Sequence, residues 1–272
     1  MQPRIKFSSQ LFNENKKSST SFCVNCISGI NCLYKNLNLD KLGKKTNQFM
    51  HNFKIKKGDP IYHNGDDTHS IYNLKIGFVK IEYTLPGGQH QINQFAIPGD
   101  LIGLDGIADG KHHLDAFALS DGEICGISLS KLNNIIKTDP DTSIVIERSM
   151  SEAINQIQEH MFSLGTHSAE EKLAFFLINY RNRLTKLNMR IDTIKLPMSR
   201  EELRSYLGVT IETLSRSFTY LEKNGYIKVR NREINFISDA KLEKFLATQD
   251  QAKQLCQQTY GGRKYISKSS FM

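Results

Sequence analysis

The frequency of glycine changes abruptly along this chain, and the change limits the folds that the chain can adopt. Between Phe53 and Leu132, short runs rich in Ile, Val, Phe and Tyr alternate with turn residues, and glycines recur throughout. After Asp139-Pro140, neither Gly nor Pro occurs again before Gly165. Frequent turns predict short antiparallel strands, and a long stretch without helix breakers predicts one long helix. We therefore expect an α+β protein with a β-rich part ahead of a helical part.

The glycine-rich part predicts a β sandwich or jelly roll. Its candidate strands follow one another at intervals of about one strand and one turn, at residues 70–74, 78–85, 90–96 and 123–128. Ahead of them, apolar residues in 36–50 recur at loose helical spacing. The polar segments 1–22 and 249–272 have no hydrophobic period, and we expect both to be loose tails.

The long helix, expected over residues 141–166, carries a narrow apolar row. Steps of four and three residues, as in a heptad repeat, connect its members Met150, Ile154, Ile157, Met161 and Leu164. Polar residues flank this row. Because so narrow a row buries little unless a second helix covers it, the pattern favours a homodimer seam. The alternative is a helix that lies on its own sandwich.

Two capping boxes mark the starts of further helices. In Ser168-Ala-Glu-Glu171 and Ser199-Arg-Glu-Glu202, the Ser hydroxyl and the last Glu carboxylate can each satisfy a free backbone N–H. The second box begins a short helix, 199–206, which a turn at Gly208 joins to a helix at 210–224. Two short helices joined by a tight glycine-containing turn are typical of a helix-turn-helix.

A hairpin is expected after the helix-turn-helix. Residues 227–229 and 234–236 are apolar at alternate positions on either side of Arg230-Asn-Arg232, which predicts two strands that form a wing. Lys and Arg outnumber Asp and Glu between Ser168 and Leu246, and the whole chain has a formal net charge of +8. This balance favours a polyanionic partner such as DNA.

The second helix of a helix-turn-helix enters the major groove with its first turns against base edges. We expect Ile211, Leu214, Phe218 and Leu221 to face inward and Ser217 to face outward. The candidate DNA contacts are Thr210, Glu212, Thr213, Ser215 and Arg216. Arg216 can donate two hydrogen bonds to guanine, Glu212 can accept from cytosine, and Ser215 can contact an acceptor or a methyl group. The alternative is that Glu212 and Arg216 pair on a solvated helix face.

Cysteine usage indicates a metal centre. Three of the five cysteines, Cys23, Cys26 and Cys32, lie within ten residues, and Cys125 lies far away on a candidate strand. No signal-like apolar core precedes them, so we expect a cytoplasmic protein, in which clustered cysteines are more often ligands or redox sensors than disulfides. Four thiolates complete a sphere around a soft metal centre such as an iron-sulfur cluster. Structural zinc is the main alternative, although four-cysteine zinc sites usually use two Cys-x2-Cys pairs.

Other classes of function have little support in the sequence. It contains no nucleophile elbow, phosphate-binding glycine loop or paired carboxylates on a defined face, so we do not expect an enzyme. No run approaches the length of a membrane span, and we expect no membrane partner. Cys256, in a Gln-rich segment, is expected to be an uncoordinated thiol.

Together these motifs resemble the cyclic-AMP receptor protein (Crp/Fnr) superfamily of bacterial transcription regulators. The segments that carry the resemblance are Pro98-Gly-Asp-Leu-Ile-Gly103, Ala169-Glu-Glu-Lys-Leu-Ala174 and Gly208-Val-Thr-Ile-Glu-Thr-Leu-Ser-Arg216. The pattern Cys-x2-Cys-x5-Cys ahead of the sandwich, with a fourth Cys inside it, is similar to the fumarate and nitrate reduction regulators (FNR), the oxygen-sensing branch of the superfamily.

The resemblance implies an architecture and a cofactor. It implies a jelly roll like that of cyclic-nucleotide-binding domains within residues 23–140, a dimerisation helix at 141–167 and a winged helix-turn-helix DNA-binding domain at 168–248. It further implies a [4Fe-4S] cluster that is stable without oxygen and is held by Cys23, Cys26, Cys32 and Cys125. In such regulators the intact cluster promotes the homodimer.

The resemblance also implies partners. The dimer would bind a palindromic promoter site, TTGAT followed by ATCAA, with Glu212, Ser215 and Arg216 at base-reading positions, and would contact RNA polymerase as an activator. Ile157 occupies the position at which the best-known member has an acidic residue that opposes pairing, and an apolar side chain there would favour the dimer. Gln89 replaces an acidic residue in a loop that helps contact RNA polymerase.

A Crp-type regulator with a small-molecule effector is a further alternative. Cyclic-nucleotide sensors share the sandwich, but they need an Arg for the cyclic phosphate and a Glu for the ribose. Residues 103–110 and the following Lys111, His112 and His113 contain no such pair. The two adjacent histidines are expected to point to opposite sides and to be solvated.

Overall fold

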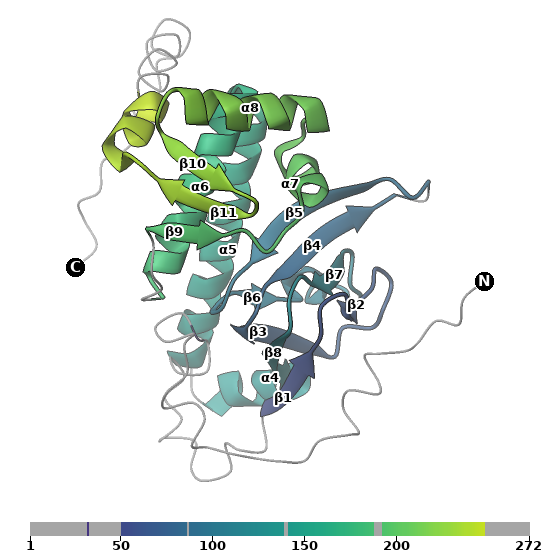
Figure 1. Ribbon diagram of the computed structural model, residues 1–272. Helices are drawn as coiled ribbons and strands as arrows, with labels where there is room; N and C mark the ends of the chain where they lie inside the picture. The colour runs from purple at the N-terminus through teal and green to yellow at the C-terminus, as the bar shows by residue number, and fades with distance from the viewer. Residues whose placement is uncertain (1–31, 33–49, 86, 139–140, 188–191, 248–272) are drawn as a thin grey trace, which may run out of the picture.

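The computed structural model describes residues 32, 50–85, 87–138, 141–187 and 192–247. In this part of the chain, two four-stranded antiparallel sheets precede a long helix, and further helices with a three-stranded sheet follow it (Figure 1). The expected α+β class, with a jelly roll ahead of a long helix and a winged helix-turn-helix, is confirmed.

Two sheets form the jelly roll. The first has the order β1-β8-β3-β6 and consists of β1 (Met50–Ile55), β8 (Gly122–Ser128), β3 (Ser70–Ile76) and β6 (Leu101–Ile102). The second has the order β2-β7-β4-β5 and consists of β2 (Pro60–Tyr62), β7 (Asp115–Ala118), β4 (Val79–Thr84) and β5 (His90–Ala96). Because side chains alternate between faces, each strand contributes to a shared core that includes Phe53, Leu74, Ile81 and Ile124.

The sequence located the expected strands to within two residues at each end. The loose helical spacing over 36–50 does not reach its last residue, because Met50 begins β1, and the other residues of this segment lie outside the described part of the chain. A short helix, α4 (Leu129–Thr138), was not expected within the β-rich part. It buries Leu132 and Ile135 beside the first sheet. A single 3-10 turn, η3 (Leu104–Gly106), follows β6.

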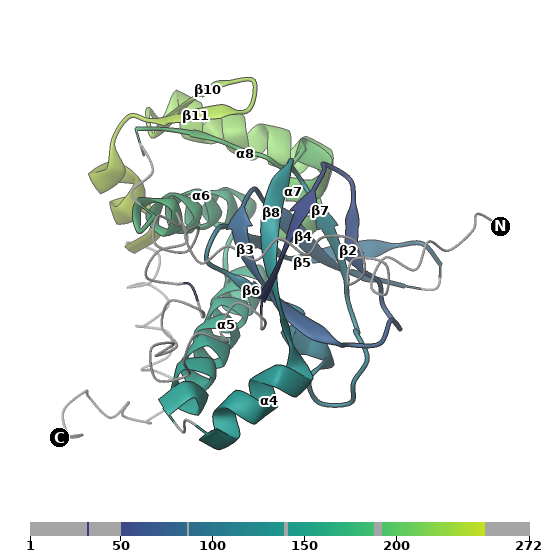
Figure 2. The same cartoon turned by 90° about the horizontal axis from the view of Figure 1, so that it is seen from below.

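The long helix is α5 (Asp141–Thr166), as expected. In the view of Figure 2, α4 and α5 lie next to each other along one side of the sheets, and the two helices are in contact. Among the residues that the structure describes, no helix is both long and apolar enough to cross a membrane.

Two helices after α5, α6 (Ala169–Thr185) and α7 (Arg200–Leu207), begin at the expected capping boxes. Helix α8 (Ile211–Lys223) follows them, with Thr210 as its N-cap. In the first box, the Ser168 hydroxyl accepts from the Glu171 N–H at 3.3 Å, and the Glu171 carboxylate accepts from the Ser168 N–H at 2.7 Å. The same pair of hydrogen bonds joins Ser199 and Glu202 at 3.1 and 2.7 Å. Both caps satisfy backbone donors that a helix start leaves free.

The wing is a hairpin of β10 (Ile227–Arg230) and β11 (Glu233–Phe236), as expected. Asn231, at its turn, has a positive φ of 56°, a conformation that Asn tolerates better than most residues. A third strand that the sequence did not reveal, β9 (Thr193–Lys195), pairs with β11.

The helix-turn-helix lies directly on the jelly roll. Ile92, Phe95 and Leu119 of the second sheet region belong to the same buried cluster as the apolar residues of α6, α7 and α8. Arg183 of α6 donates to the carbonyl of Phe95 at 3.2 Å and forms an ion pair with Asp100. The two halves therefore share one buried cluster, which is separate from the core between the two sheets of the jelly roll.

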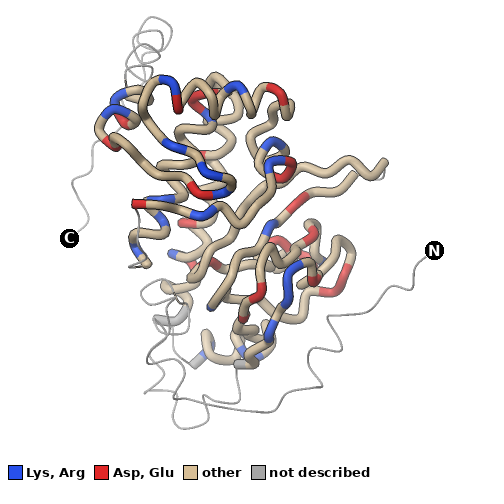
Figure 3. Tube along the Cα trace, viewed as in Figure 1, with Lys and Arg blue, Asp and Glu red and all other residues tan. Residues whose placement is uncertain are grey.

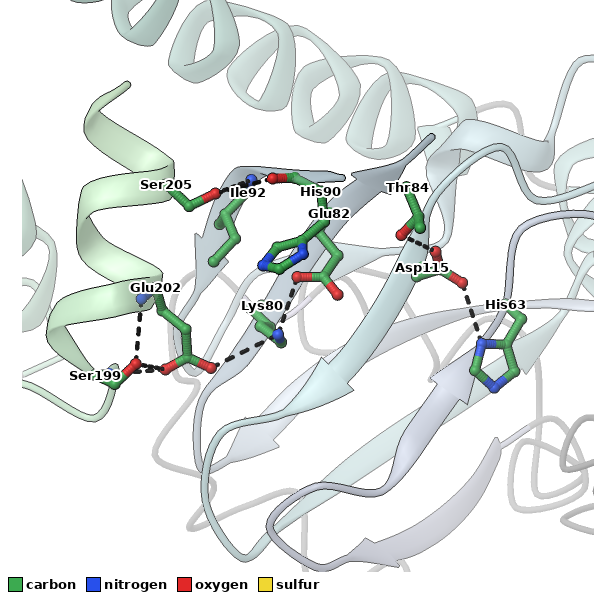
Figure 4. A network of polar contacts seen from close by, with 10 residues as sticks. All are labelled: His63, Lys80, Glu82, Thr84, His90, Ile92, Asp115, Ser199, Glu202 and Ser205. Carbon is green, nitrogen blue, oxygen red and sulfur yellow. Dashed lines mark hydrogen bonds and ion pairs between the residues drawn. The ribbon is translucent and has the colours of Figure 1, made fainter. Parts of the chain in front are cut away.

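Polar contacts at the edge strand β5 reinforce this joint (Figure 4). The Ser205 hydroxyl of α7 accepts from the Ile92 N–H at 3.2 Å and donates to the His90 carbonyl at 3.3 Å. Lys80 of β4 lies 2.9 Å from the Glu82 carboxylate and 3.6 Å from that of Glu202. Helix α7 thus satisfies backbone groups that an edge strand would leave unpaired.

Candidate functional site

Helix α8 is presented by a tight turn and a side-chain cap. Gly208 ends α7 in the left-handed conformation with a φ of 62°, which favours glycine because it has no Cβ. The Thr210 hydroxyl then accepts from the Thr213 N–H at 3.2 Å and lies 3.0 Å from the Thr213 hydroxyl. Two of the five expected DNA contacts, Thr210 and Thr213, therefore also form the N-cap of α8.

The other three expected DNA contacts lie together on the exposed face of α8. Glu212, Ser215 and Arg216 are all exposed within its first two turns. Two expectations for this helix are wrong. Ser217 is fully buried, and its hydroxyl donates to the Thr213 carbonyl at 3.0 Å. Ile211 is 39% exposed, because at the first position of the helix it lies beyond the edge of the core.

Charge on α8 is set by local contacts. The pKa of the Glu212 carboxyl is lowered because its own backbone N–H and the Thr210 hydroxyl donate to it, with further help from Arg216 and Arg204. Glu212 is therefore ionised at neutral pH and is available as an acceptor. Further basic residues lie along the wing hairpin (Figure 3). Lys228 and Arg230 of β10 are exposed.

Helix α8 is held by contacts with α7 and with the wing. The guanidinium of Arg200 lies over the Phe218 ring, 3.4 Å from its centroid, and the Glu222 carboxylate accepts from the Val229 N–H at 2.8 Å. The first contact ties α8 to α7 and the second ties α8 to the wing. All three elements consequently present one surface.

The apolar row of α5 divides into three parts. Ile154, Ile157 and Met161 are 52%, 49% and 65% exposed. Met150 packs against a buried cluster that contains Cys32, Ile71 and Ile127. At the other end, a Cβ added at Gly208 would lie 3.4 Å from Cδ2 of Leu164, so this residue lies beside the turn between α7 and α8. The row therefore has an exposed centre, and each end lies against a different half of the molecule.

Of the four expected metal ligands, the structure describes Cys32 and Cys125, and Cys23 and Cys26 lie outside the described residues. Both described thiols are buried, each with 6% exposure. Cys125 is two residues from Ile127 on β8, so the two side chains share a face of the sheet. Ile127 in turn shares a cluster with Cys32. Both cysteines therefore lie on the outer face of the first sheet, where α4 and α5 cover it.

This arrangement fits a thiolate-bound metal centre. Within the described residues, no group of three or more His, Cys, Asp and Glu side chains lies close enough to hold a metal ion. Two soft ligands on one buried face would thus need further ligands from outside that part of the chain. Two buried amide oxygens, from Asn52 and Asn73, also lack a hydrogen-bond partner among the described residues of this region.

The two adjacent histidines behave differently from each other. His113 is exposed, as expected, but His112 is 2% exposed and stacks on Tyr62, with ring centroids 3.7 Å apart. Asp105 lies 3.3 Å from Nδ1 of His112. Burial alone would raise the pKa of Asp105, but hydrogen bonds from His112 and from two backbone N–H groups outweigh it and lower the pKa. His112 is a structural residue, which its position on a polar loop did not reveal.

The sequence also did not reveal the groups that join the two halves. The contacting partners are more than a hundred residues apart, as in the pairs Lys80 with Glu202 and Ile92 with Ser205. No local sequence pattern relates such residues. A cavity of about 450 Å³ lies between the second sheet and α5. Its lining is mainly apolar, and Tyr62, Gln91 and Asp105 contribute polar groups.

Comparisons with known proteins match both halves. Residues 52–139 match the cyclic nucleotide-binding domain, and residues 171–245 match the Crp-like helix-turn-helix domain. The regulatory protein HlyX of Actinobacillus pleuropneumoniae is 34% identical over 85% of this chain and 96% of its own length. The nitrogen fixation regulation protein FixK of Bradyrhizobium diazoefficiens is 32% identical over 83% of this chain and 94% of its own length. This chain belongs to the Crp/Fnr family.

As a Crp/Fnr protein, the chain is a DNA-binding transcription regulator and not an enzyme. The solved structure of FixK2 from Bradyrhizobium japonicum superposes with a TM-score of 0.66 at 28% identity, over 72% of this chain and 96% of that one. The Crp/Fnr assignment agrees with the resemblance inferred from the motifs.

Proposed function

We propose that this Crp/Fnr regulator responds to oxygen through a [4Fe-4S] cluster held by Cys23, Cys26, Cys32 and Cys125. When bound, the cluster supplies an oxygen-labile inorganic core whose presence distinguishes anaerobic from aerobic conditions. The observation that carries the proposal is the burial of Cys32 and Cys125 on one face of the first sheet. In a reducing compartment, buried clustered thiols bind a soft metal centre more often than they form disulfides.

The cysteine face is connected to the proposed dimer seam. Met150, at the start of the apolar row on α5, packs on the cluster of side chains that contains Cys32. A shift in the position of Cys32 would therefore change the packing around Met150 of α5. The exposed centre of the row, Ile154, Ile157 and Met161, is the proposed contact with a second copy. Because so few side chains form this contact, a small change in packing can shift the balance between monomer and dimer.

The DNA-binding half completes the switch. Leu164, at the end of the row, lies beside the Gly208 turn that leads into α8. We propose residues 141–167 as the dimerisation helix and 168–248 as the DNA-binding domain, following the jelly roll in residues 23–140. In the dimer, two α8 helices would face successive major grooves, with Arg216, Glu212 and Ser215 reading bases of a palindromic promoter site. RNA polymerase is the proposed further partner.

The names of relatives support this reading. The transcriptional activator protein FnrA of Stutzerimonas stutzeri is 30% identical over 79% of this chain, and an anaerobic regulatory protein of Aggregatibacter actinomycetemcomitans is 30% identical over 86%. A related chain with the same architecture can sense a different signal, so the cysteines remain the decisive feature.

Metal analysis of the full chain tests the proposal. Protein purified without oxygen is expected to contain iron and acid-labile sulfide, to absorb visible light, and to sediment as a dimer that binds the palindrome. Exposure to air should remove the absorption and weaken both association and binding. Cys125→Ser should lose the iron, whereas Cys256→Ser should keep it. A colourless sample that contains zinc, or a metal-free dimer that occupies the palindrome, would contradict the proposal.

The cavity beside α5 favours a second candidate function, control by a small molecule. Its volume of about 450 Å³ and its mainly apolar lining suit a compact effector. Ile154, Ile157 and Met161 line this cavity as well as the exposed row, so an occupant would contact the proposed seam. Retention of DNA binding by an iron-free Cys125→Ser variant would favour this candidate over the cluster.

A further inference from the structure

Two asparagines flank Cys125 on neighbouring strands. Asn52 of β1 and Asn73 of β3 both lie directly opposite Cys125 of β8 in the strand register. Residues directly opposite each other on antiparallel strands share a face of the sheet, with Cβ atoms about 4.5–5.5 Å apart. Both amides therefore lie beside the thiol, on the outer face that Ile71 and Ile127 otherwise make apolar.

The burial of these amides is unusual. Asn73 is 1% exposed, and the Oδ1 atoms of Asn52 and Asn73 are both buried without a hydrogen-bond partner among the described residues. A buried amide oxygen without a donor destabilises a fold, and asparagine is also a poor strand former. Two such residues on either side of one thiol indicate that this region receives a polar group, because an apolar contact would favour Val or Ile at both positions.

The amide of Asn73 is held in one orientation, whereas that of Asn52 can rotate. Nδ2 of Asn73 donates to the Gly99 carbonyl at 3.0 Å and lies 3.4 Å from the Asp100 carbonyl, which fixes the orientation of this amide. No hydrogen bond from the described residues holds the side chain of Asn52. Rotation about its Cβ–Cγ bond exchanges Oδ1 and Nδ2, so Asn52 can turn an N–H donor toward Cys125.

We propose that Asn52 is a positioning residue for the metal centre, and that it donates an amide hydrogen bond to the sulfur of Cys125 when the cluster is bound. This inference rests on the proposed function. Hydrogen bonds to the sulfurs of an iron-sulfur centre stabilise their negative charge and change its reduction potential. Since the donor disfavours loss of an electron to oxygen, Asn52 slows the aerobic loss of the cluster.

Substitutions at Asn52 test the inference in the full chain. Asn52→Leu removes the donor and keeps a side chain that branches at Cγ, and Asn52→Asp removes it at nearly the same size and shape. Ser70→Ala is the matched control, because the Ser70 hydroxyl, like Oδ1 of Asn52, is buried without a hydrogen-bond partner among the described residues. Ser70 shares the opposite, inner face of β3 with Tyr72 and Leu74.

Three readouts on anaerobically purified protein separate the outcomes. They are the iron and sulfide content, the Fe–S stretching frequencies in the resonance Raman spectrum, and the rate at which visible absorption decays in air-saturated buffer. We expect both Asn52 variants to keep their iron, to shift the Fe–S frequencies and to decay about three to ten times faster, as for the loss of one hydrogen bond. Ser70→Ala should match the wild type in frequencies and rate.

Frequencies and decay rates equal to those of the wild type in both Asn52 variants would overturn the inference while leaving the cluster intact. A lower melting temperature without those spectroscopic changes would also overturn it, because it would show a purely structural role. Wild-type protein without iron would instead refute the proposed function, and the inference with it.

Discussion

His160 of α5 stacks on Tyr206 of α7, with ring centroids 3.8 Å apart and ring planes 13° from parallel. The contact joins the long helix to the first helix of the helix-turn-helix. Burial, together with the positive charge of Lys172, lowers the pKa of His160 to about 4. The imidazole is therefore neutral at pH 7 and stacks on Tyr206 as an uncharged ring.

This lowered pKa predicts a loss of stability in mild acid. In the unfolded chain the pKa of His160 returns to about 6.5, so the unfolded state binds more protons than the folded state between pH 6.5 and pH 4. The free energy of unfolding should then fall as the pH decreases through this window. Melting temperatures measured from pH 7 to pH 4.5 should fall less steeply for His160→Gln than for the wild type. The exposed His113→Gln serves as control, and equal slopes for His160→Gln and the wild type would contradict the prediction.

Ser205→Ala tests the joint between α7 and the edge of β5. The change removes the acceptor of the Ile92 N–H, which is buried, and the donor to the His90 carbonyl. Leaving a buried backbone donor unpaired costs about 1–3 kcal/mol of stability, which urea unfolding measures. Ser215→Ala, on the exposed face of α8, should change stability by less than about 0.5 kcal/mol. A similar small effect of Ser205→Ala would show that the joint contributes little.

Arg216→Ala is expected to relax the choice of base. The side chain is exposed on the first turns of α8, where it can donate two hydrogen bonds to one guanine per half-site. Its loss should weaken binding to the palindrome by about 1–3 kcal/mol and reduce discrimination at one base pair. Binding titrations with single-base variants of the site measure both effects. Lys228→Ala, on the wing, is the control and should weaken binding to all sequences alike. If Arg216→Ala also weakened binding to all sequences alike, Arg216 would contact a phosphate and not a base.

Ile157→Asp is expected to dissociate the proposed dimer. Ile157 is about half exposed in the single chain, so the substitution leaves the core of each copy unchanged. In a pair of helices it would replace a buried apolar contact, of about 1.5–3 kcal/mol per side chain, by two facing carboxylates. Sedimentation of the anaerobic protein should show at least about a tenfold weaker association. Asn155→Asp adds the same charge at an exposed position off the apolar row, and it should sediment like the wild type.

Elements that are set by interactions between residues close in the chain were predicted correctly from the sequence. The capping boxes at Ser168 and Ser199, the turn at Gly208 and the long helix without breakers all lie where the sequence predicted them. These features arise from hydrogen bonds and steric preferences within a few residues. The loose helical spacing over 36–50 was a weaker guide, because apolar residues at such spacing do not distinguish a helix from the start of a strand such as β1.

The sequence alone thus determined the order of jelly roll, long helix and winged helix-turn-helix, the exposure of Glu212, Ser215 and Arg216, and the family. Only the tertiary structure decided that Cys32 and Cys125 share a buried face, that Asn52 and Asn73 flank one of them, and that Ser217 and His112 are buried. It also placed Ser205 against β5. The reason is physical: these contacts join residues far apart along the chain, and strand order and packing between the two halves create them without leaving any period in the sequence.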